Sequence, residues 1–90
     1  MVKFRLYVAG AAHNSTQAIS NLNALCRAYL PDRYHIEIID VFRVPKRALA
    51  DGIYMTPTLV KLAPSPIREI VGTLSQTGIV LQALGLGVPA

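Results

Sequence analysis

The first half of the chain carries the pattern that most restricts the fold, because it places a helix between two strands. Residues 3–8 alternate apolar and polar side chains, which predicts a β-strand. Residues 15–30 repeat apolar side chains at the spacing of one helical face, and residues 34–41 alternate again. A strand, a helix and a strand of these lengths predict a right-handed parallel unit. The two faces of the first strand are expected to carry Phe4, Leu6 and Val8 on one side and Lys3, Arg5 and Tyr7 on the other.

Local signals mark the ends of the long helix. Asn14, with Gln17 three places later, predicts a capping box at its N-terminus. The small residues 9–13 predict a loop before it, and Pro31-Asp32 is expected to end the helix.

The second half of the chain predicts shorter elements. Pro45 suits a first helical position and Gly52 suits the residue after a last turn, so a helix of at most two turns is expected between them. Residues 58–62 and 67–71 predict two strands. The tight Pro-Ser-Pro connection between them predicts that these strands pair antiparallel.

A last helix is expected near the C-terminal end. Ser75 is its candidate N-cap, and the apolar spacing continues to Leu84. Gly78 and Gly85 weaken this helix because glycine lowers helix propensity. Residues 87–90 are expected to be a loose end.

Together these elements predict the order βαβαββα in one domain of 90 residues, a thioredoxin-like α/β arrangement. Pro57 falls at the entry to the third strand, where that fold places a cis peptide bond, so a cis bond is expected there. A chain this short buries only about 60–65% of its unfolded surface. Self-association or a partner surface is therefore a reasonable expectation.

The charge balance favours acidic partners. Nine Lys and Arg against five Asp and Glu give a formal net charge of +4. The cations are scattered, with one local cluster at Arg43, Lys46 and Arg47, and there is no Gly-aromatic motif of an RNA-binding sheet. An acidic protein surface is thus better supported than nucleic acid. No apolar run approaches the roughly 20 residues that cross a bilayer, and no signal peptide precedes the first strand. We therefore expect a cytoplasmic protein without a membrane partner.

No arrangement of side chains predicts catalysis. A thioredoxin-like redox enzyme needs a Cys-x-x-Cys at the start of its first helix, where this chain has residues 10–16 without sulfur. The one cysteine, Cys26, falls on the apolar face of the helix and is expected in the core. His13 and Ser15 are interpreted as a loop residue and a first-turn residue, not as a base and a nucleophile.

The acidic residues do not form a spaced acid–base pair. Glu37, Asp40, Asp51 and Glu69 are isolated along the chain, and with two histidines they form no recognisable metal cluster. Asp40, at the end of a strand, is expected to cap the backbone or to pair with a nearby cation. The chain is therefore expected to be neither an enzyme nor a carrier of a metal or cofactor.

Several short motifs occur in one order along the chain. They are Leu6-Tyr7-Val8-Ala9-Gly10, Asn14-Ser15, Ile39-Asp40-Val41, Pro45, Thr56-Pro57-Thr58-Leu59-Val60-Lys61, Pro64-Ser65-Pro66-Ile67-Arg68 and Gly72-Thr73-Leu74-Ser75. In this combination, roughly from residue 3 to residue 86, the chain resembles the KaiB family of circadian clock proteins. The N-terminal sensor domain of the clock histidine kinase SasA is related, but no kinase follows here. A stand-alone KaiB-like protein is the expected match.

The resemblance implies a non-enzymatic binding protein. KaiB proteins dock on the first ATPase domain of the KaiC hexamer, modulate its cycle and, in cyanobacteria, sequester KaiA and displace SasA. They also adopt two folds: a ground state, often tetrameric, with the order βαββααβ, and a thioredoxin-like state that binds KaiC. The order predicted from the residues matches the second fold, and the first is the alternative.

Departures from the family pattern favour the thioredoxin-like state as a monomer or dimer, with a tetramer as the alternative. Family members typically have Gly-Asp-Leu-Ser at residues 72–75, and they end in Leu-x-Gly-Leu-Asp-Leu-Leu-Tyr with an acidic tail. Ala83 replaces a glycine of that segment, which favours helix by about 1 kcal/mol, while Gly85 works against helix and strand alike. The tyrosine and tail that a tetramer would use are missing.

For docking, the resemblance points to the short second helix and the loop after it. A hydrophobic centre with a cationic rim would anchor on an acidic surface and speed encounter. The alternative is that Ile53 and Tyr54 simply cover the core. The candidate partner-binding residues are Lys46, Arg47, Ile53, Tyr54, Pro57, Lys61 and Arg68.

Two other functions stay open. A glutathione-transferase-like or thioredoxin-like ligand-binding protein without redox cysteines would use the backbone beside Pro57, although no helical second domain completes a substrate pocket. A KaiB homologue outside a true clock would serve a stress-related role with a KaiC homologue and without KaiA.

Overall fold

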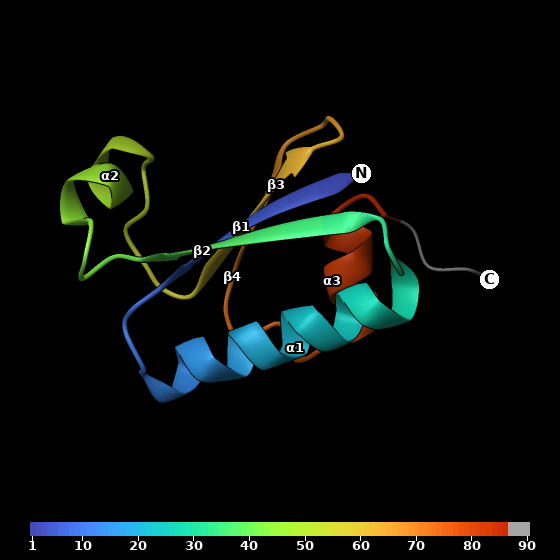
Figure 1. Cartoon of the computed structure of the whole chain (residues 1–90), viewed down its shortest axis with the longest axis horizontal. Coiled ribbons are helices and arrows are strands. Elements are labelled where there is room, and N and C mark those ends of the chain that lie inside the picture. Colours follow the sequence, from blue (N-terminus) through green and yellow to red (C-terminus); the bar gives the residue numbers. More distant parts are fainter. Residues whose placement is uncertain (87–90) are drawn as a thin grey trace.

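A four-stranded sheet in the order β2-β1-β3-β4 forms the centre of the protein (Figure 1). The structure is a computed structural model and describes residues 1–86; the expected loose end at 87–90 lies outside the described residues. Its elements are β1 (Val2–Val8), α1 (His13–Tyr29), β2 (Tyr34–Asp40), α2 (Pro45–Ala50), β3 (Thr58–Ala63), β4 (Arg68–Val71) and α3 (Thr77–Ala83). The order βαβαββα is the predicted one, not the alternative βαββααβ.

The strand pairing also follows the prediction. β1 pairs in parallel with β2 and antiparallel with β3, and β3 pairs antiparallel with β4. The Thr56–Pro57 peptide bond at the entry to β3 is cis, as expected, and the bonds before Pro64 and Pro66 are cis as well. No helix among residues 1–86 is long and apolar enough to cross a membrane.

The larger core lies between the sheet and the layer formed by α1 and α3 (Figure 1). Alternation in β1 directs Phe4, Leu6 and Val8 into it, each no more than 3% exposed. Cys26 on α1 is fully buried in the same core, which confirms its predicted place. Because each fully buried side chain of this size contributes about 1.5–3 kcal/mol, this layer provides most of the hydrophobic stabilisation.

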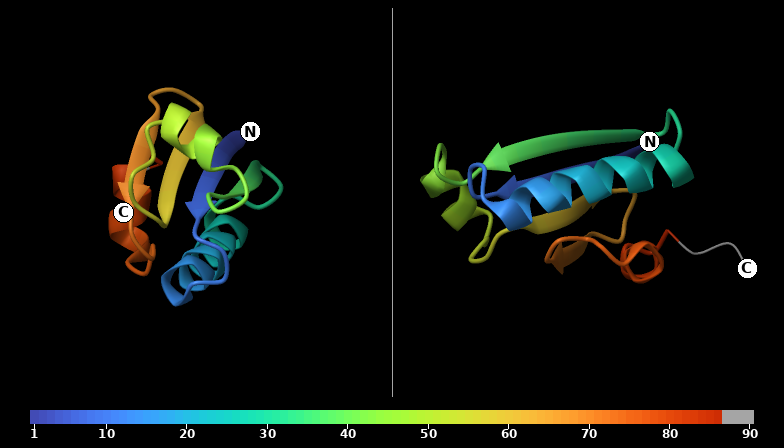
Figure 2. Two further views of the ribbon diagram at one scale, coloured as in Figure 1. Left: turned by 90° about the vertical axis from the view of Figure 1, so that its left-hand side faces the viewer. Right: turned by 90° about the horizontal axis from the view of Figure 1, so that it is seen from below.

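A smaller cluster occupies the opposite face, at the end of the sheet where α2 lies (Figure 2). It consists of Tyr7, Ile39, Ala48 and Ile53. Tyr7 lies on the strand face predicted for it, with Lys3 and Arg5, but it is only 2% exposed. The alternation of β1 is intact, but α2 covers this part of the second face and converts it into core.

The helix N-termini use other residues than predicted. The N-cap residue of α1 is Ala12, so Asn14 lies inside the helix and the predicted capping box is wrong. The N-cap residue of α3 is Gln76, and Ser75 precedes it. Ser15 is buried in the first turn of α1, where its Oγ accepts a 3.0 Å hydrogen bond from the Ala9 N–H. This bond joins the end of β1 to the start of α1.

Two glycines in the left-handed conformation end helices. Gly52 follows α2 with φ +75°, and Gly85 follows α3 with φ +72°. After α2, the Gly52 N–H bonds the Leu49 carbonyl at 3.1 Å and the Ile53 N–H bonds the Ala48 carbonyl at 2.9 Å. This Schellman arrangement requires a left-handed residue, which glycine adopts without steric cost. The prediction for Gly52 is confirmed, whereas Gly85 ends the last helix and does not weaken its interior.

Candidate functional site

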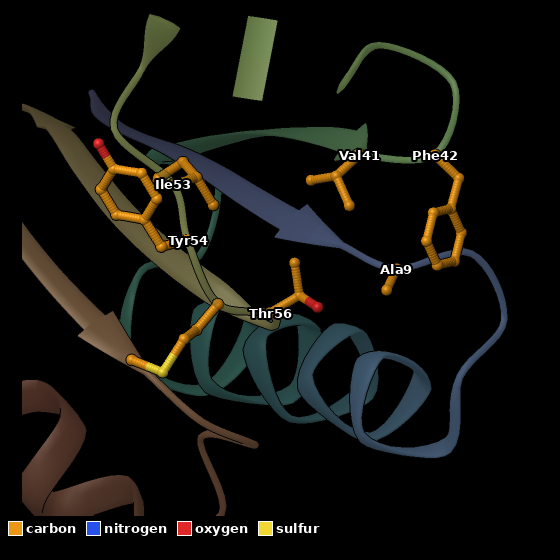
Figure 3. Close-up of a pocket in the computed structure, with 7 residues that line it drawn as sticks. Ala9, Val41, Phe42, Ile53, Tyr54 and Thr56 are labelled. Atoms are coloured by element: carbon orange, nitrogen blue, oxygen red, sulfur yellow. The ribbon is translucent and has the colours of Figure 1, made fainter. Parts of the chain in front are cut away.

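An open groove of about 230 Å³ lies at the end of the sheet where β1 and β2 finish and β3 begins (Figure 3). Figure 3 shows Phe42 on the segment after β2 and Tyr54 on the loop before β3, with Ala9 and Thr56 between them. The residues that line the groove are Ala9, Val41, Phe42, Ile53, Tyr54, Met55 and Thr56. Within this lining only Tyr54 carries an ionisable side chain, so the groove is suited to binding and offers no acid–base pair.

Asp40 fixes the side of the groove that Phe42 forms. Its Oδ1 accepts hydrogen bonds from the Gly10 N–H at 3.1 Å and the Phe42 N–H at 2.9 Å. Its Oδ2 lies 3.9 Å from Nε of Arg43. Asp40 therefore both caps the backbone and pairs with a cation, and the predicted structural role is confirmed. Gly10 is left-handed at φ +55°, and a Cβ there would lie 3.3 Å from the Phe42 ring.

The end of α2 fixes the other side of the groove. Its Schellman turn directs Ile53 into the smaller core, where the residue is 6% exposed, and leaves Tyr54 83% exposed. The interpretation that both residues cover the core is thus right for Ile53 and wrong for Tyr54. Met55, the next residue, is 61% exposed.

Two large apolar residues beside the groove were missed in the sequence. Phe42 is 74% exposed and Met55 61% exposed. Phe42 follows the apolar run that ends β2, and a large aromatic residue just beyond a strand end was an available signal. Met55 lies directly before the Thr-Pro-Thr motif, and no local pattern distinguishes it from a core residue.

The cations near α2 divide into two groups. Arg43 has a side chain that is 87% exposed, and Lys46 is exposed on α2. Arg47 instead lies against acidic groups, with Nη2 3.5 Å from Oε1 of Glu37 and Nε 3.7 Å from Oδ2 of Asp51. Lys46 thus has no ion pair among residues 1–86, and Arg43 keeps most of its side chain exposed although it lies 3.9 Å from Oδ2 of Asp40.

The remaining candidate residues lie elsewhere. Pro57 is buried at the entry to β3. Lys61 on β3 is 2% exposed, so it is not part of an exposed cationic rim. Arg68 is exposed and lies opposite Lys61 in the β3–β4 register. A Cβ built on Gly85 would lie 3.7 Å from Nζ of Lys61 and 4.0 Å from Nε of Arg68, which places both cations beside the end of α3.

The sequence indicated that Glu37 and Asp51 are isolated carboxylates. In the structure they belong to one cluster of charged side chains. Nε of Arg5 donates a 2.7 Å hydrogen bond to Oε1 of Glu37, and its Nη1 lies 4.0 Å from Oδ2 of Asp51. The hydroxyl of Tyr7 donates a 2.6 Å hydrogen bond to Oδ2 of Asp51. Together with Arg47, these side chains connect β1, β2 and α2.

The cluster changes the ionisation of its members. The hydrogen bond from Arg5 lowers the pKa of Glu37, and the charge of Arg47 acts in the same direction. Burial raises the pKa of Tyr7, and its hydrogen bond to Asp51 raises it further. Glu37 therefore stays ionised and Tyr7 stays protonated over a wider pH range than in an unfolded chain.

The one cysteine of the described residues is buried, and these residues form no cluster of metal-ligating side chains. Burial raises the pKa of the Cys26 thiol to about 11, so it is inert as a nucleophile near neutral pH. Residues 1–86 contain no group of three or more His, Cys, Asp or Glu side chains that could hold a metal ion.

Comparison with known proteins identifies relatives of this chain. The KaiB domain family model matches residues 5–86. The circadian clock protein KaiB3 of Synechocystis sp. is 44% identical over 87 residues, which are 97% of this chain and 83% of that protein. The circadian clock oscillator protein KaiB of Cyanothece sp. is 42% identical over 82 residues, 91% of this chain and 78% of that protein.

Solved structures define the fold. The N-terminal domain of Synechococcus elongatus SasA superimposes with a TM-score of 0.73 at 19% identity, covering 99% of this chain and 88% of that domain. Chloroplastic thioredoxin z superimposes with a TM-score of 0.75 at 16% identity, covering 97% of this chain and 80% of that protein. These likenesses confirm the predicted thioredoxin-like fold.

Proposed function

Because this chain belongs to the KaiB family, we propose that it is a non-enzymatic regulatory protein that docks on a KaiC-type hexameric ATPase. Docking would modulate the phosphorylation and ATPase cycle of that partner in the cytoplasm. A KaiA-like protein and a clock histidine kinase are further partners where they occur. The same docking would serve a stress-related role in a host without a true clock.

The observation that carries this proposal is the set of large apolar side chains left exposed around the groove. Phe42, Tyr54 and Met55 are 74%, 83% and 61% exposed. Exposed aromatic residues and methionine at a shared surface are typical of the centre of a protein–protein interface. The groove between them would accept a single apolar side chain of the partner.

Charge supports an acidic partner surface. Arg43 and Lys46 lie exposed close to Phe42 in the chain, and the side chain of Arg43 stays 87% exposed although its Nε lies 3.9 Å from Oδ2 of Asp40. Exposed cations around an apolar centre speed encounter with an acidic surface and help to orient it. We define Phe42, Arg43, Lys46, Tyr54 and Met55 as the docking surface.

The remaining candidates take indirect roles in this proposal. Ile53 and Pro57 are buried and support the loop that carries Tyr54 and Met55. Arg47 holds α2 through its acidic neighbours. Arg68, exposed beside the end of α3, is a second candidate contact, whereas Lys61 next to it is buried and would act only through Arg68 and the end of α3.

The test is complex formation with a KaiC-type hexameric ATPase from the same genome, measured by light-scattering size exclusion in the presence of ATP. The wild-type chain should form a complex, and Tyr54→Ala should weaken it about tenfold or more, as removal of an interface anchor does. The matched control is Ile79→Ala, because Ile79 on α3 is also apolar and 62% exposed. Absence of a complex with the wild type, or equal loss in both variants, would contradict the proposal.

A ligand-binding protein of the glutathione-transferase or thioredoxin kind is the second candidate. The observation that favours it is that Thr56, directly before Pro57, lines the groove. At about 230 Å³ the groove is smaller than the usual 300–1,000 Å³ of small-molecule sites. Titration with glutathione, followed by amide NMR, decides the matter: localised shifts at Thr56 would favour this function, and their absence would favour docking.

A further inference from the structure

We propose that the cluster of Arg5, Tyr7, Glu37, Arg47 and Asp51 is the element that holds α2 against the sheet. We call these five residues the α2 clasp. When the clasp is disrupted, residues 43–56 should detach while the sheet, α1 and α3 stay folded. The clasp would thereby control whether the loop after α2 is held in place.

The first argument is that α2 has little apolar attachment of its own. It has six residues, of which only Ala48 is buried, and Leu49 on the same helix is 64% exposed. Ile53, just after the helix, provides the other buried contact. A helix of this length is not stable alone in water, so it depends on what ties it to the sheet.

The second argument is the geometry of the clasp. Arg47 and Asp51 belong to α2 and its C-cap, whereas Arg5 and Tyr7 belong to β1 and Glu37 to β2. Both Arg47 and Asp51 contact the sheet: Nη2 of Arg47 lies 3.5 Å from Oε1 of Glu37, and Oδ2 of Asp51 accepts the 2.6 Å hydrogen bond of the Tyr7 hydroxyl. The polar contacts thus span both ends of the last turn of α2.

The third argument concerns strength. The side chains of Arg5, Glu37, Arg47 and Asp51 are 24–42% exposed, so each pair alone is weak and is screened by salt. Their combination shares each charge between two partners, and the buried Tyr7 hydroxyl adds a contact that salt screens less. The attachment of α2 is therefore adjustable, unlike the α1–α3 core.

The consequence for binding rests on the proposed function. Tyr54 and Met55 lie on the loop that leaves α2, and Lys46 lies on α2 itself. Release of residues 43–56 would disperse four of the five residues of the docking surface, all except Phe42. Docking would then be weaker without any change in a residue that contacts the partner.

The test measures hydrogen–deuterium exchange in the free protein, which needs no partner. The probes are the amides of Ala48, Asp51 and Ile53, which bond the carbonyls of Val44, Arg47 and Ala48, and their rates are divided by the rate of Leu6 in β1. Glu37→Lys should speed these three amides about fivefold or more relative to Leu6, because it places three cations together. The matched control is Glu69→Lys, since Glu69 is exposed on β4 and has no ion pair among residues 1–86.

Salt provides a second measurement on the unaltered chain. In 1 M NaCl the three α2 amides of the wild type should exchange faster relative to Leu6, and this increment should be smaller in Arg47→Gln. The proposal is overturned if Glu37→Lys leaves the α2 rates relative to Leu6 unchanged. That includes the case in which all amides, Leu6 among them, accelerate by the same factor. If the clasp result holds and no KaiC-type complex forms, only the proposed function fails.

Discussion

The hydroxyl of Tyr7 donates a 2.6 Å hydrogen bond to Oδ2 of Asp51, which joins the central strand to the C-cap residue of α2. The two residues are 44 positions apart in the chain. Tyr7 is 2% exposed, so its hydroxyl has few opportunities to bond water if Asp51 is removed. This bond anchors the smaller core beneath the loop that carries Tyr54.

Tyr7→Phe should lower the free energy of unfolding by about 1.5–3 kcal/mol, because a hydrogen bond to a charged acceptor is lost while the ring stays buried. Urea denaturation followed by circular dichroism measures the change. Tyr54→Phe is the matched control and should change stability by less than about 0.5 kcal/mol, since Tyr54 is 83% exposed. Equal effects of the two variants would show that the Tyr7–Asp51 bond contributes nothing.

Acid should destabilise the protein through Glu37. The hydrogen bond from Arg5 lowers the folded-state pKa of Glu37 below its unfolded value of about 4.3. Its contribution is present above the unfolded pKa and is lost as pH falls through the folded pKa. Stability measured by urea denaturation from pH 6 to pH 3 should therefore fall less steeply in Glu37→Gln than in the wild type. A wild-type slope in Glu37→Gln would contradict the assignment.

Two glycine substitutions should act in opposite directions. Gly78→Ala should raise stability by about 1 kcal/mol, because Gly78 lies inside α3 and a Cβ there meets no atom within 4 Å. Gly52→Ala should lower stability by about 1 kcal/mol although its surroundings are equally open, because φ is +75°. Thermal or urea unfolding measures both. Effects of the same sign would contradict the assignment of Gly52 as the left-handed residue that ends α2.

Cys26 should be unreactive in the folded protein. Its pKa of about 11 leaves little thiolate at pH 8, and its side chain is fully buried. Iodoacetamide should therefore alkylate the native chain at least about 100-fold more slowly than the urea-unfolded chain, as followed by mass spectrometry. Fast alkylation of the native chain would place Cys26 outside the core.

Local patterns in the sequence were sufficient to predict most of the helices and strands. Alternation predicted β1 and β2, helical spacing predicted α1, and the βαβ unit followed from their lengths and order. The same spacing placed Cys26 in the core, and the pair Pro45 and Gly52 bounded α2. These features depend on side chains close together in the chain, so a local pattern reports them directly. Cap positions were less reliable, because Ala12 could begin α1 without a side-chain cap.

The docking surface and the clasp were decided by tertiary structure. Alternation placed Tyr7 on the same strand face as Lys3 and Arg5 but did not show that this end of the face is buried; α2 packs there and makes it core. Glu37 and Asp51 looked isolated because the residues that pair them, Arg5 and Arg47, are brought together by the fold. A sequence determines which face of a strand a residue occupies, whereas burial and charge pairing depend on which distant element covers that face. The sequence therefore determined the secondary structure and its order, and only the packing of α2 against the sheet decided which apolar and charged side chains around α2 are buried, paired or left exposed.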